Sequence, residues 1–470
     1  METTELFGHP QKLVMDPVHG GIPLFAHELD AIDQPLFQRL RHICQNDILF
    51  MVFPGARHSR FEHSIGTMHV AGRFYKAVIR AYLGEGSTNG KAIPQAVVDA
   101  INYFYHVVRL AALLHDVGHA PFSHQFEQPK KTKELLNFDL LWPEDKWKAY
   151  YQQKPVEIHH EHFSVRYALE ILTGVRHSPV ETQDVLVILE TATGPPSPTF
   201  ERHVGQLASF FVPYLPANDS LSSIALSFLR KMITSELDVD KMDYLLRDSY
   251  YSGSHYGSYN LDHLLTTVRF GFDPSDNWTG IGITEKGIHP LEDFVHSRFQ
   301  MYVSVYYHKT VSGLRWLLEE AINEILKDPA VAGWISTALY NPHEFVYLTD
   351  SYFWEAFRAY ARSHPGSASD RLFSRQKLKY LFAKTNISQF EIKSLVAPLL
   401  EQDVVVRNSK AKFSNLHESV DEIRVIVRDR ASGRRSLKSV RSVSSFFGKF
   451  ENTRITQVFE KPDLEAVPLR

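Results

Sequence analysis

The sequence predicts a mainly α-helical protein that ends in a small α+β part. Apolar residues recur with helical spacing in five stretches, 64–83, 107–115, 163–172, 221–233 and about 290–327. The helical pattern weakens after about residue 390, and the segments 423–427 and 454–459 have the composition of β-strands. We therefore expect a helical core over 1–330, a helical extension over 331–390 and an α+β C-terminal appendage over 391–470.

The clearest helical patterns lie in the first third of the chain. Over 64–83, Ile65, Met68 and Tyr75 fall near one stripe, as an amphipathic helix requires, and a Gly/Ser/Asn run at 84–90 marks its end. The stretch 107–115 is apolar apart from Arg109, which predicts a helix buried in the core.

Two regions predict other structure. The sequence Gly-Pro-Pro-Ser-Pro at 194–198 cannot continue a helix and predicts a loop. Alternating residues over 267–272 and 280–284 predict a small hairpin around a turn at 273–277.

Bulk composition limits the classes of protein to which the chain can belong. The 51 Lys and Arg residues against 54 Asp and Glu leave a formal charge of −3, which gives no support for non-specific binding to nucleic acids or membranes. A single cysteine, Cys44, excludes an internal disulfide framework and fits a reducing compartment. The polar start of the chain has no signal-peptide core, and no apolar run approaches the length of about 18 residues that a membrane span needs. We therefore expect a cytoplasmic protein without a membrane span.

Four short segments concentrate residue types that bind metals, namely 60–63 (RFEH), 115–119 (HDVGH), 159–162 (HHEH) and 238–240 (DVD). Imidazole and carboxylate ligands together suit Mn, Fe, Zn, Co or Ni, and Mg where carboxylates dominate. In the most informative segment, a buried apolar helix ends in adjacent His115 and Asp116, and binding a cation is one of the few ways to offset burial of such groups. Each segment alone has an ordinary explanation, such as a helix-end hydrogen bond, a core histidine or a capping carboxylate. Their combination predicts a metal site.

The order H…HD…D of these segments resembles the HD-domain superfamily. The flanking sequences resemble its deoxynucleoside triphosphate triphosphohydrolase branch, which includes SAM- and HD-domain-containing enzymes and bacterial dGTPase-like enzymes. The matching motifs include DPVHG (16–20), FPGARHSRFEHSIG (53–66), LLHDVGHAPFSH (113–124), HEHFS (160–164) and DVDKMDYLLRDSYYSG (238–253). The resemblance covers roughly 10–310 and implies an HD-type helical core. Fifteen residues precede DPVHG, so we expect no SAM domain in front of it.

The resemblance implies that a divalent metal is held by His63, His115, Asp116 and Asp240. Such a metal keeps open positions for water and a phosphate oxygen. The resemblance also places His119, His124 and His160 in the active site as catalytic residues, one of which protonates the leaving oxygen. The alternative for His124 is a supporting hydrogen bond to a metal ligand.

The implied substrate residues fall into three groups: Arg60, Lys241 and Arg298 for the phosphates, Gln45 and Asp248 for the sugar 3′-hydroxyl, and Tyr244 and Tyr306 for aromatic contacts. The alternative for any one cation is a surface salt bridge. Aromatic residues in an apolar helix are usually core residues, which is the alternative for Tyr306.

The chain departs from its relatives where they commonly have Gln-Leu-Gly and it has Gln45-Asn46-Asp47. Asn46 replaces an apolar residue that crowds the sugar 2′ position, so we expect weaker discrimination against ribose. Four further residues match positions that bind an activating nucleotide in the family, namely Lys12, Asp33, Gln38 and Arg41. Helix packing is the alternative explanation for the FQRLR motif (37–41). The resemblance also implies a homo-oligomer, a dimer or tetramer.

Three functions remain open from the sequence. The preferred one is an enzyme that splits a (deoxy)nucleoside triphosphate into nucleoside and triphosphate. The second is a phosphohydrolase of another phosphate ester, such as a nucleoside monophosphate, and free triphosphate as product distinguishes the two. The third is a non-catalytic nucleotide sensor or nucleic-acid-binding protein, supported by the basic segment 424–454. That segment lacks clear aromatic interleaving, so a basic edge that binds an effector or a neighbouring subunit fits it better.

Overall fold

The structure is a computed structural model that describes residues 6–83, 92–189, 191–211, 221–273, 278–399, 404–411, 423–428, 435–449 and 453–464. The run at 84–90, expected to end the first helix, and residues 274–277 of the expected turn lie outside these residues.

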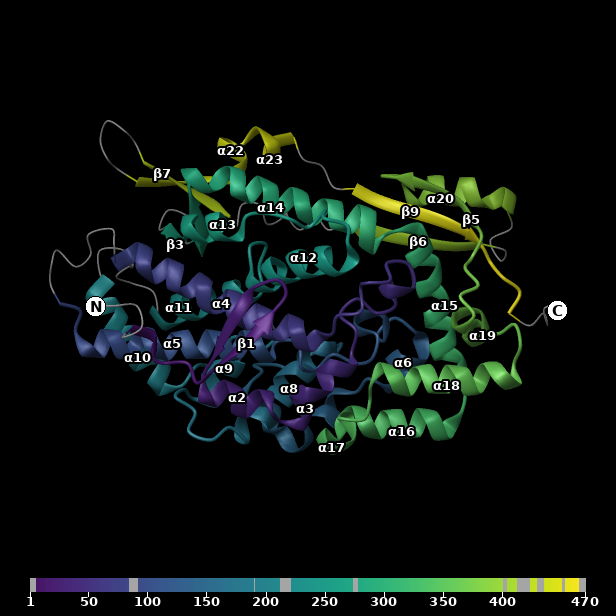
Figure 1. Cartoon of the computed structure of the whole chain (residues 1–470), viewed down its shortest axis with the longest axis horizontal. Coiled ribbons are helices and arrows are strands. Elements are labelled where there is room, and N and C mark those ends of the chain that lie inside the picture. Colours follow the sequence, from purple (N-terminus) through teal and green to yellow (C-terminus); the bar gives the residue numbers. More distant parts are fainter. Residues whose placement is uncertain are drawn as a thin grey trace.

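Helices form most of the described chain, which confirms the mainly α fold class (Figure 1). The longer helices are α4 (Arg60–Tyr82), α5 (Gln95–Leu114), α8 (His160–Thr173), α10 (Pro198–Phe211), α11 (Leu221–Ile233), α12 (Val239–Ser252), α14 (Ile288–Met301), α15 (Lys309–Ile325), α16 (Pro329–Tyr340), α18 (Asp350–Ser363) and α20 (Gln389–Val396). The short helices are α2 (Ala26–Ile32), α3 (Pro35–Gln38), α6 (Lys130–Leu135), α7 (Phe138–Leu141), α9 (Thr182–Leu186), α13 (Leu261–Thr267), α17 (Pro342–Phe345), α19 (Ala368–Phe373), α22 (Val440–Val443) and α23 (Ser445–Lys449).

The centre of the core is the packing of α4 against α5, with α12 on the other side of α4. Helix α5 is buried along nearly its whole length, as its apolar sequence predicts. Of the described helices, α5 alone is long and apolar enough to cross a membrane, but 83% of its most apolar window is buried inside the protein. Burial of this degree is what the central helix of a folded core shows.

The helical stretch expected over about 290–327 consists of two helices with an interruption. After α14 ends at Met301, Tyr302–Tyr306 form a π-helical turn, and α15 begins at Lys309. Such turns occur frequently at functional sites. This one places Tyr302, Tyr306 and Tyr307 in the wall of a large cavity.

Three small sheets accompany the helices. An N-terminal hairpin, β1 (Lys12–Asp16) and β2 (Gly20–Leu24), crosses in front of α4 in Figure 1 and was not expected from the sequence. The hairpin expected over 267–284 is present as β3 (Val268–Asp273) and β4 (Trp278–Thr284).

The C-terminal strands extend this second hairpin and build a third sheet. Strand β7 (Arg424–Arg428) pairs in parallel with β4, and β8 (Arg435–Ser439) completes a sheet of order β3-β4-β7-β8. The other sheet has the order β5-β9-β6, formed by Tyr380–Thr385, Thr453–Glu460 and Val404–Ala411. The expected strands 423–427 and 454–459 thus correspond to β7 and β9, while the domain boundaries at 330 and 390 stay predictions.

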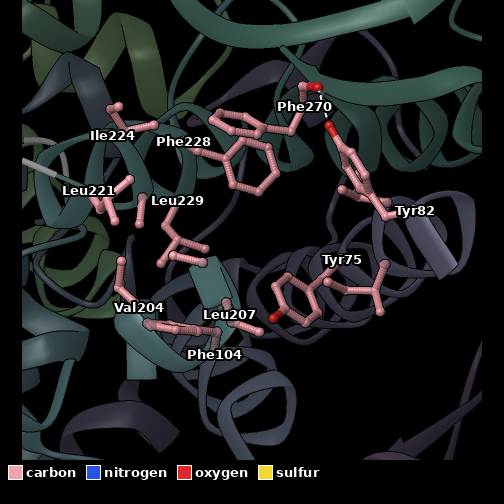
Figure 2. A pocket seen from close by; sticks show the side chains of 14 residues that line it. Tyr75, Tyr82, Phe104, Val204, Leu207, Leu221, Ile224, Phe228, Leu229 and Phe270 are labelled. Carbon is pink, nitrogen blue, oxygen red and sulfur yellow. Dashed lines mark hydrogen bonds between the residues drawn. The ribbon is translucent and has the colours of Figure 1, made fainter. Parts of the chain in front are cut away.

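An apolar cavity of about 130 Å³ lies between α4, α5, α10, α11 and β3 (Figure 2). Its wall is made of aliphatic and aromatic side chains, among them Phe104, Phe228 and Phe270. The hydroxyl of Tyr82 donates to the carbonyl oxygen of Phe270, and the Tyr75 hydroxyl is buried without a partner. No charged group lines this cavity, so it does not suit a phosphate ligand.

Candidate metal centre and polar cavity

Three helix ends bring the four expected metal ligands together. His63 lies in the first turn of α4, and Asp240 lies in the first turn of α12. His115 and Asp116 follow the last residue of α5.

Local sequence fixes the starts of α4 and α12. Ser59 Oγ accepts from the backbone N of Phe61, and Glu62 accepts from the backbone N of Ser59, which forms a capping box. Asp238 caps α12 by accepting from the backbone N of Lys241 at 2.8 Å. These caps fix the turns that carry His63 and Asp240.

The ligand atoms converge without bonding to one another. His63 Nε2 lies 3.0 Å from Asp240 Oδ1 and 3.5 Å from Asp116 Oδ2. His115 Nε2 lies 3.6 Å from Asp240 Oδ1 and 3.4 Å from Asp116 Oδ1. Both Nε2 atoms are buried and lack a partner with hydrogen-bond geometry. Because buried polar atoms are normally satisfied, this donor set fits a divalent metal between the four side chains.

The other nitrogen of each histidine faces an acceptor. His115 Nδ1 lies 2.8 Å from the carbonyl oxygen of Ala112, which can only accept, so Nδ1 donates and Nε2 of the neutral ring keeps its lone pair. His63 Nδ1 lies 2.9 Å from Asp243 Oδ2. Both rings are therefore oriented to coordinate through Nε2, as metal-binding histidines usually are when an acceptor holds the opposite nitrogen.

Asp243 is the centre of a buried ion-pair network behind His63. Its carboxylate accepts from Arg247 Nε and Nη2 at 2.8 and 3.0 Å, and His19 Nε2 lies 2.6 Å from Oδ1. Arg247 also donates to Asp16 at 2.8 Å, which ties the N-terminal hairpin to the network. Gly66 of α4 faces the network so closely that a Cβ would lie 2.0 Å from Asp243 Oδ1. Helices α4 and α12 approach this closely because residue 66 has no side chain.

The electrostatics between the ligands favour a positive charge. Burial acts to lower the pKa of His63, but the carboxylates of Asp240 and Asp243 outweigh it and raise this pKa to about 10. Burial acts to raise the pKa of Asp116, yet Arg60 and His115 hold it well below its usual range. The site therefore attracts cations, and a metal ion would compete with a proton for His63.

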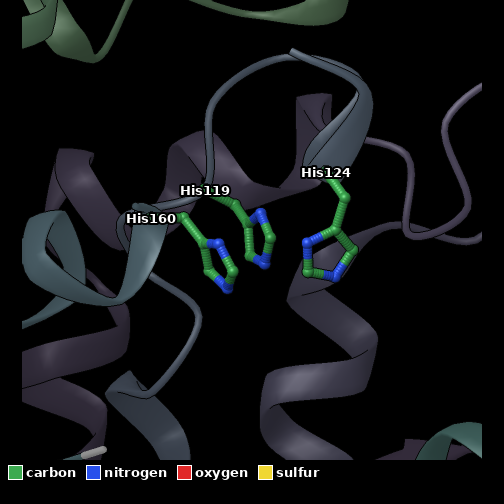
Figure 3. A group of neighbouring side chains, drawn as sticks. All are labelled: His119, His124 and His160. Atoms are coloured by element: carbon green, nitrogen blue, oxygen red, sulfur yellow. The ribbon is translucent and has the colours of Figure 1, made fainter. Parts of the chain in front are cut away.

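His119, His124 and His160 meet beside the metal ligands (Figure 3). The rings of His119 and His160 stack with centroids 3.7 Å apart, and His124 meets them edge-on at 4.9 and 4.8 Å. His119 Nε2 lies 3.4 Å from Asp116 Oδ1, so the cluster borders the metal centre. His160 Nδ1 lies 3.1 Å from Glu127 Oε1.

These three histidines differ in their affinity for a proton. Burial together with Arg60 holds the pKa of His119 well below its usual range, whereas the side chain of His124 is exposed. Burial also acts against a charge on His160, but its hydrogen bond with Glu127 and the negative charges of Glu161 and Asp116 together outweigh burial and raise its pKa. His160 in turn lowers the pKa of Glu127 to about 2, against the effect of burial. Of His119 and His160, His160 holds its proton more firmly.

The metal centre opens into a polar cavity of about 1020 Å³, at the upper end of the range of small-molecule sites. All of the expected catalytic and substrate residues line it: His119, His124, His160, Gln45, Arg60, Lys241, Tyr244, Asp248, Arg298 and Tyr306. The expected metal ligands His115, Asp116 and Asp240 also line it, while His63 is fully buried.

Each of the three expected phosphate cations faces a carboxylate. Arg60 pairs with Asp116, Lys241 Nζ lies 2.6 Å from Asp238 Oδ2, and Arg298 Nη1 lies 2.8 Å from Glu236 Oε2. The Nε of Arg298 is buried without a partner. Their contact with phosphate stays a prediction.

One pair of charged side chains in the cavity wall was missed from the sequence. Arg315 of α15 donates from Nη2 to Asp47 Oδ2 at 2.8 Å, and both residues line the cavity. Gln45 and Asp47 are among the described residues that line the cavity, and Asn46 is not. Of the two departures from the relatives, Asp47 is therefore the one that faces the cavity. The only available signal was this local departure, because residue 315 lies in an ordinary amphipathic helix.

The expected activator-binding residues lie in and near α2, α3 and β1. Lys12, Asp33 and Arg41 are exposed, and Arg41 Nε donates to Gln38 Oε1 at 2.7 Å. The Arg41 guanidinium also lies over the Phe61 ring. A role for these four residues in nucleotide binding stays a prediction.

The basic C-terminal segment is partly engaged within the sheet. Arg424 pairs with Asp273 at 2.7 Å and lies over the Trp278 ring. Arg430 and Arg434 lie outside the described residues.

Comparisons with known proteins agree with this arrangement. Residues 60–248 match the HD domain family. The chain is 30% identical over 353 residues to a bovine protein named deoxynucleoside triphosphate triphosphohydrolase SAMHD1, covering 73% of this chain and 54% of that protein. It is 29% identical over 311 residues to an uncharacterized protein of Methanocaldococcus jannaschii, covering 66% of this chain and 49% of that protein. The chain thus spans about half the length of these curated relatives.

A solved structure shares the fold across nearly the whole chain. A hypothetical protein from Aquifex aeolicus aligns with a TM-score of 0.62 at 24% identity, covering 96% of each chain. Residues 60–248, which carry the four expected metal ligands, therefore match the HD domain family, and the similarity to this solved structure shows a fold shared over nearly the whole chain.

Proposed function

We propose that this protein hydrolyses (deoxy)nucleoside triphosphates to a nucleoside and intact triphosphate. The observation that carries the proposal is one cavity that combines a divalent-metal centre, three cationic side chains and a histidine cluster. The similarity to the bovine triphosphohydrolase supports the same activity.

The metal would be held by His63, His115, Asp116 and Asp240. When bound, it would polarise a phosphate oxygen and acidify a coordinated water molecule. Arg60, Lys241 and Arg298 line the same cavity. They would bind the charged phosphate oxygens in place of their present carboxylate partners.

The histidine cluster would transfer the proton that the leaving nucleoside oxygen requires. His160 is suited to donate it because Glu127 raises its pKa. The lowered pKa of His119 keeps its ring neutral near neutral pH, and His119 and His124 would position the phosphate by hydrogen bonds. Removing the nucleoside as an alcohol leaves the three phosphates joined.

The test is to incubate the purified protein with each dNTP and NTP in the presence of Mn²⁺, Mg²⁺, Co²⁺, Ni²⁺, Zn²⁺ or Fe²⁺ and to identify products by ion-exchange chromatography. We expect nucleoside and triphosphate in equal amounts. Inorganic phosphate, pyrophosphate, or hydrolysis of a monophosphate alone would contradict the proposal.

Two variants identify the centre responsible. His115→Ala and Asp240→Asn should lose both bound metal and turnover. His289→Ala is the matched control, because its side chain is 91% exposed and distant from the cavity lining. Full turnover in either ligand variant would contradict the proposed metal centre.

We also propose that the protein is a homo-oligomer and that a nucleotide at Lys12, Asp33, Gln38 and Arg41 activates it. The exposed position of three of these residues leaves them accessible to a ligand. Tests of both statements are given below.

A further inference from the structure

Helix α12 gives the polar cavity a direction. Asp240, Tyr244 and Asp248 are spaced by four residues, so they share one face of the helix and line the cavity in that order. Asp248 lies about 12 Å along the helix axis from the metal ligand Asp240, from a rise of about 1.5 Å per residue. A phosphate bound at the metal therefore directs the remainder of the ligand toward Asp248.

Two carboxylates are linked through Tyr306 at the far end of this path. Asp248 Oδ2 accepts from the Tyr306 hydroxyl at 2.6 Å, and Asp248 Oδ1 lies 2.7 Å from His58 Nε2. The second carboxylate is Asp47, which accepts from Arg315 Nη2 at 2.8 Å. Arg315 Nη1 donates to the carbonyl oxygen of Tyr306 at 2.7 Å, so Tyr306 joins the two acidic groups.

Arg315 and Asp248 retain hydrogen-bonding capacity, whereas Asp47 is engaged by Arg315 and by the backbone N of Ile48. The hydrogen bonds of Arg315 to Asp47 and Tyr306 use one N–H each on Nε, Nη1 and Nη2, and a guanidinium has five, so two remain. Asp248 uses two of about four lone-pair sites. Gln45, which lines the same wall, has its Oε1 buried without a partner.

A pair of adjacent hydroxyl groups complements this wall. One hydroxyl can donate to Asp248 beside Tyr306, and its neighbour can accept from the remaining N–H groups of Arg315, which the ion pair with Asp47 holds in the wall. An apolar wall would favour a sugar without the second hydroxyl, whereas a charged wall favours the sugar that has it.

We infer that the Asp47–Arg315 pair binds the 2′-hydroxyl of a ribose, so that ribonucleoside triphosphates are substrates at least as good as their deoxy counterparts. The inference rests on the proposed triphosphohydrolase function. Asp248 and Gln45 take the 3′-hydroxyl, and Arg315 and Asp47 take its neighbour. We therefore attribute the expected weaker discrimination against ribose to Asp47 and Arg315 rather than to Asn46.

The experiment measures kcat/KM for the four NTP and dNTP pairs that share a base, with triphosphate release as the readout. In the wild type, we expect an NTP/dNTP ratio of one or more for the preferred base. Arg315→Met and Asp47→Asn should lower that ratio by about tenfold or more, the scale of losing a hydrogen bond to a charged group.

Arg315→Lys separates substrate contact from support of the wall. A lysine keeps the ion pair with Asp47 but lacks the planar fork, so the wall should stay folded while the ratio falls. Arg358→Met, at an exposed arginine outside the cavity lining, is the matched control and should leave the ratio unchanged.

Two results overturn the inference. One is a wild-type preference for every dNTP by more than about tenfold, and the other is an equal loss for both sugars in Arg315→Met and Arg315→Lys. If neither NTPs nor dNTPs release triphosphate, that result would instead contradict the proposed function. In that case, the ratio of dissociation constants for NTP and dNTP, measured by calorimetry in the presence of Mn²⁺, tests the sugar contact by the same criteria.

Discussion

Gly66→Ala should destabilise the protein and weaken metal binding, although it changes neither a ligand nor a residue of the cavity wall. The new Cβ would lie 2.0 Å from Asp243 Oδ1 and 2.2 Å from Arg247 Nη2, far inside van der Waals contact. Both atoms belong to fully buried side chains that already bond each other, so neither can move without breaking that ion pair. The displaced Asp243 would then release His63 Nδ1.

The magnitude follows from two opposing effects. Breaking a buried ion pair costs about 3–5 kcal/mol. Alanine in place of glycine within a helix returns about 1 kcal/mol through backbone propensity. We therefore expect the free energy of unfolding to fall by about 2–4 kcal/mol.

Urea unfolding followed by circular dichroism measures this loss, and metal content per chain measures the effect on His63. Gly333→Ala in α16 is the matched control, because nothing lies within 4 Å of its Cβ position. The control should gain up to about 1 kcal/mol. If Gly66→Ala behaves like Gly333→Ala in both assays, the close approach of α4 and α12 does not support the metal centre.

Four further outcomes are expected. Asp243→Asn should weaken metal affinity by about 10- to 100-fold while all four ligands remain, and equilibrium dialysis measures this. Metal binding should release a proton from His63, because its pKa is raised to about 10, so affinity should increase with pH; titration calorimetry in two buffers of different ionisation enthalpy counts the proton. Glu127→Gln should move the alkaline limb of the pH–rate profile to lower pH. An acid catalyst loses its proton as the pH rises through its pKa, and the variant no longer raises the pKa of His160. An unmoved limb would exclude His160 as the acid, and Glu157→Gln, at an exposed residue outside the cavity lining, is the control. Light scattering with nucleotide and metal should show a dimer or tetramer, and Arg41→Ala should abolish nucleotide activation; a 54 kDa species alone, or unchanged activation, would contradict these two proposals.

The helical fold could be predicted from the sequence because its signals are local. Apolar spacing identified α11 with its observed bounds and placed α5 in the core. The interruption after Met301 could not be predicted, because the apolar pattern runs through the π-helical turn without a proline or glycine to mark it. The pairing of β7 with β4 joins strands that are distant in sequence, and no local pattern encodes such a register.

The candidate site shows the same division. The candidate metal ligands stand in short motifs, so the sequence could single them out before the structure showed that they lie close together. The supporting contacts could not, because His19 and Asp243 are 224 residues apart and Arg315 and Asp47 are 268 apart. Packing of segments that are distant in sequence decides which hydrogen-bond partners meet. Nothing in the sequence around Gly66 indicates that this residue lies opposite Asp243.

The N-terminal hairpin has a practical consequence for work with shortened forms of the protein. Asp16 accepts a hydrogen bond from Arg247 and His19 contacts Asp243, so the N-terminal hairpin supports the candidate metal centre. A truncation that begins after residue 20 would retain every coordinating side chain and still leave Arg247 with one acidic partner fewer. Loss of activity in such a fragment would thus be explained by weaker support of the candidate metal centre, and it would not be evidence that the removed segment binds a regulator.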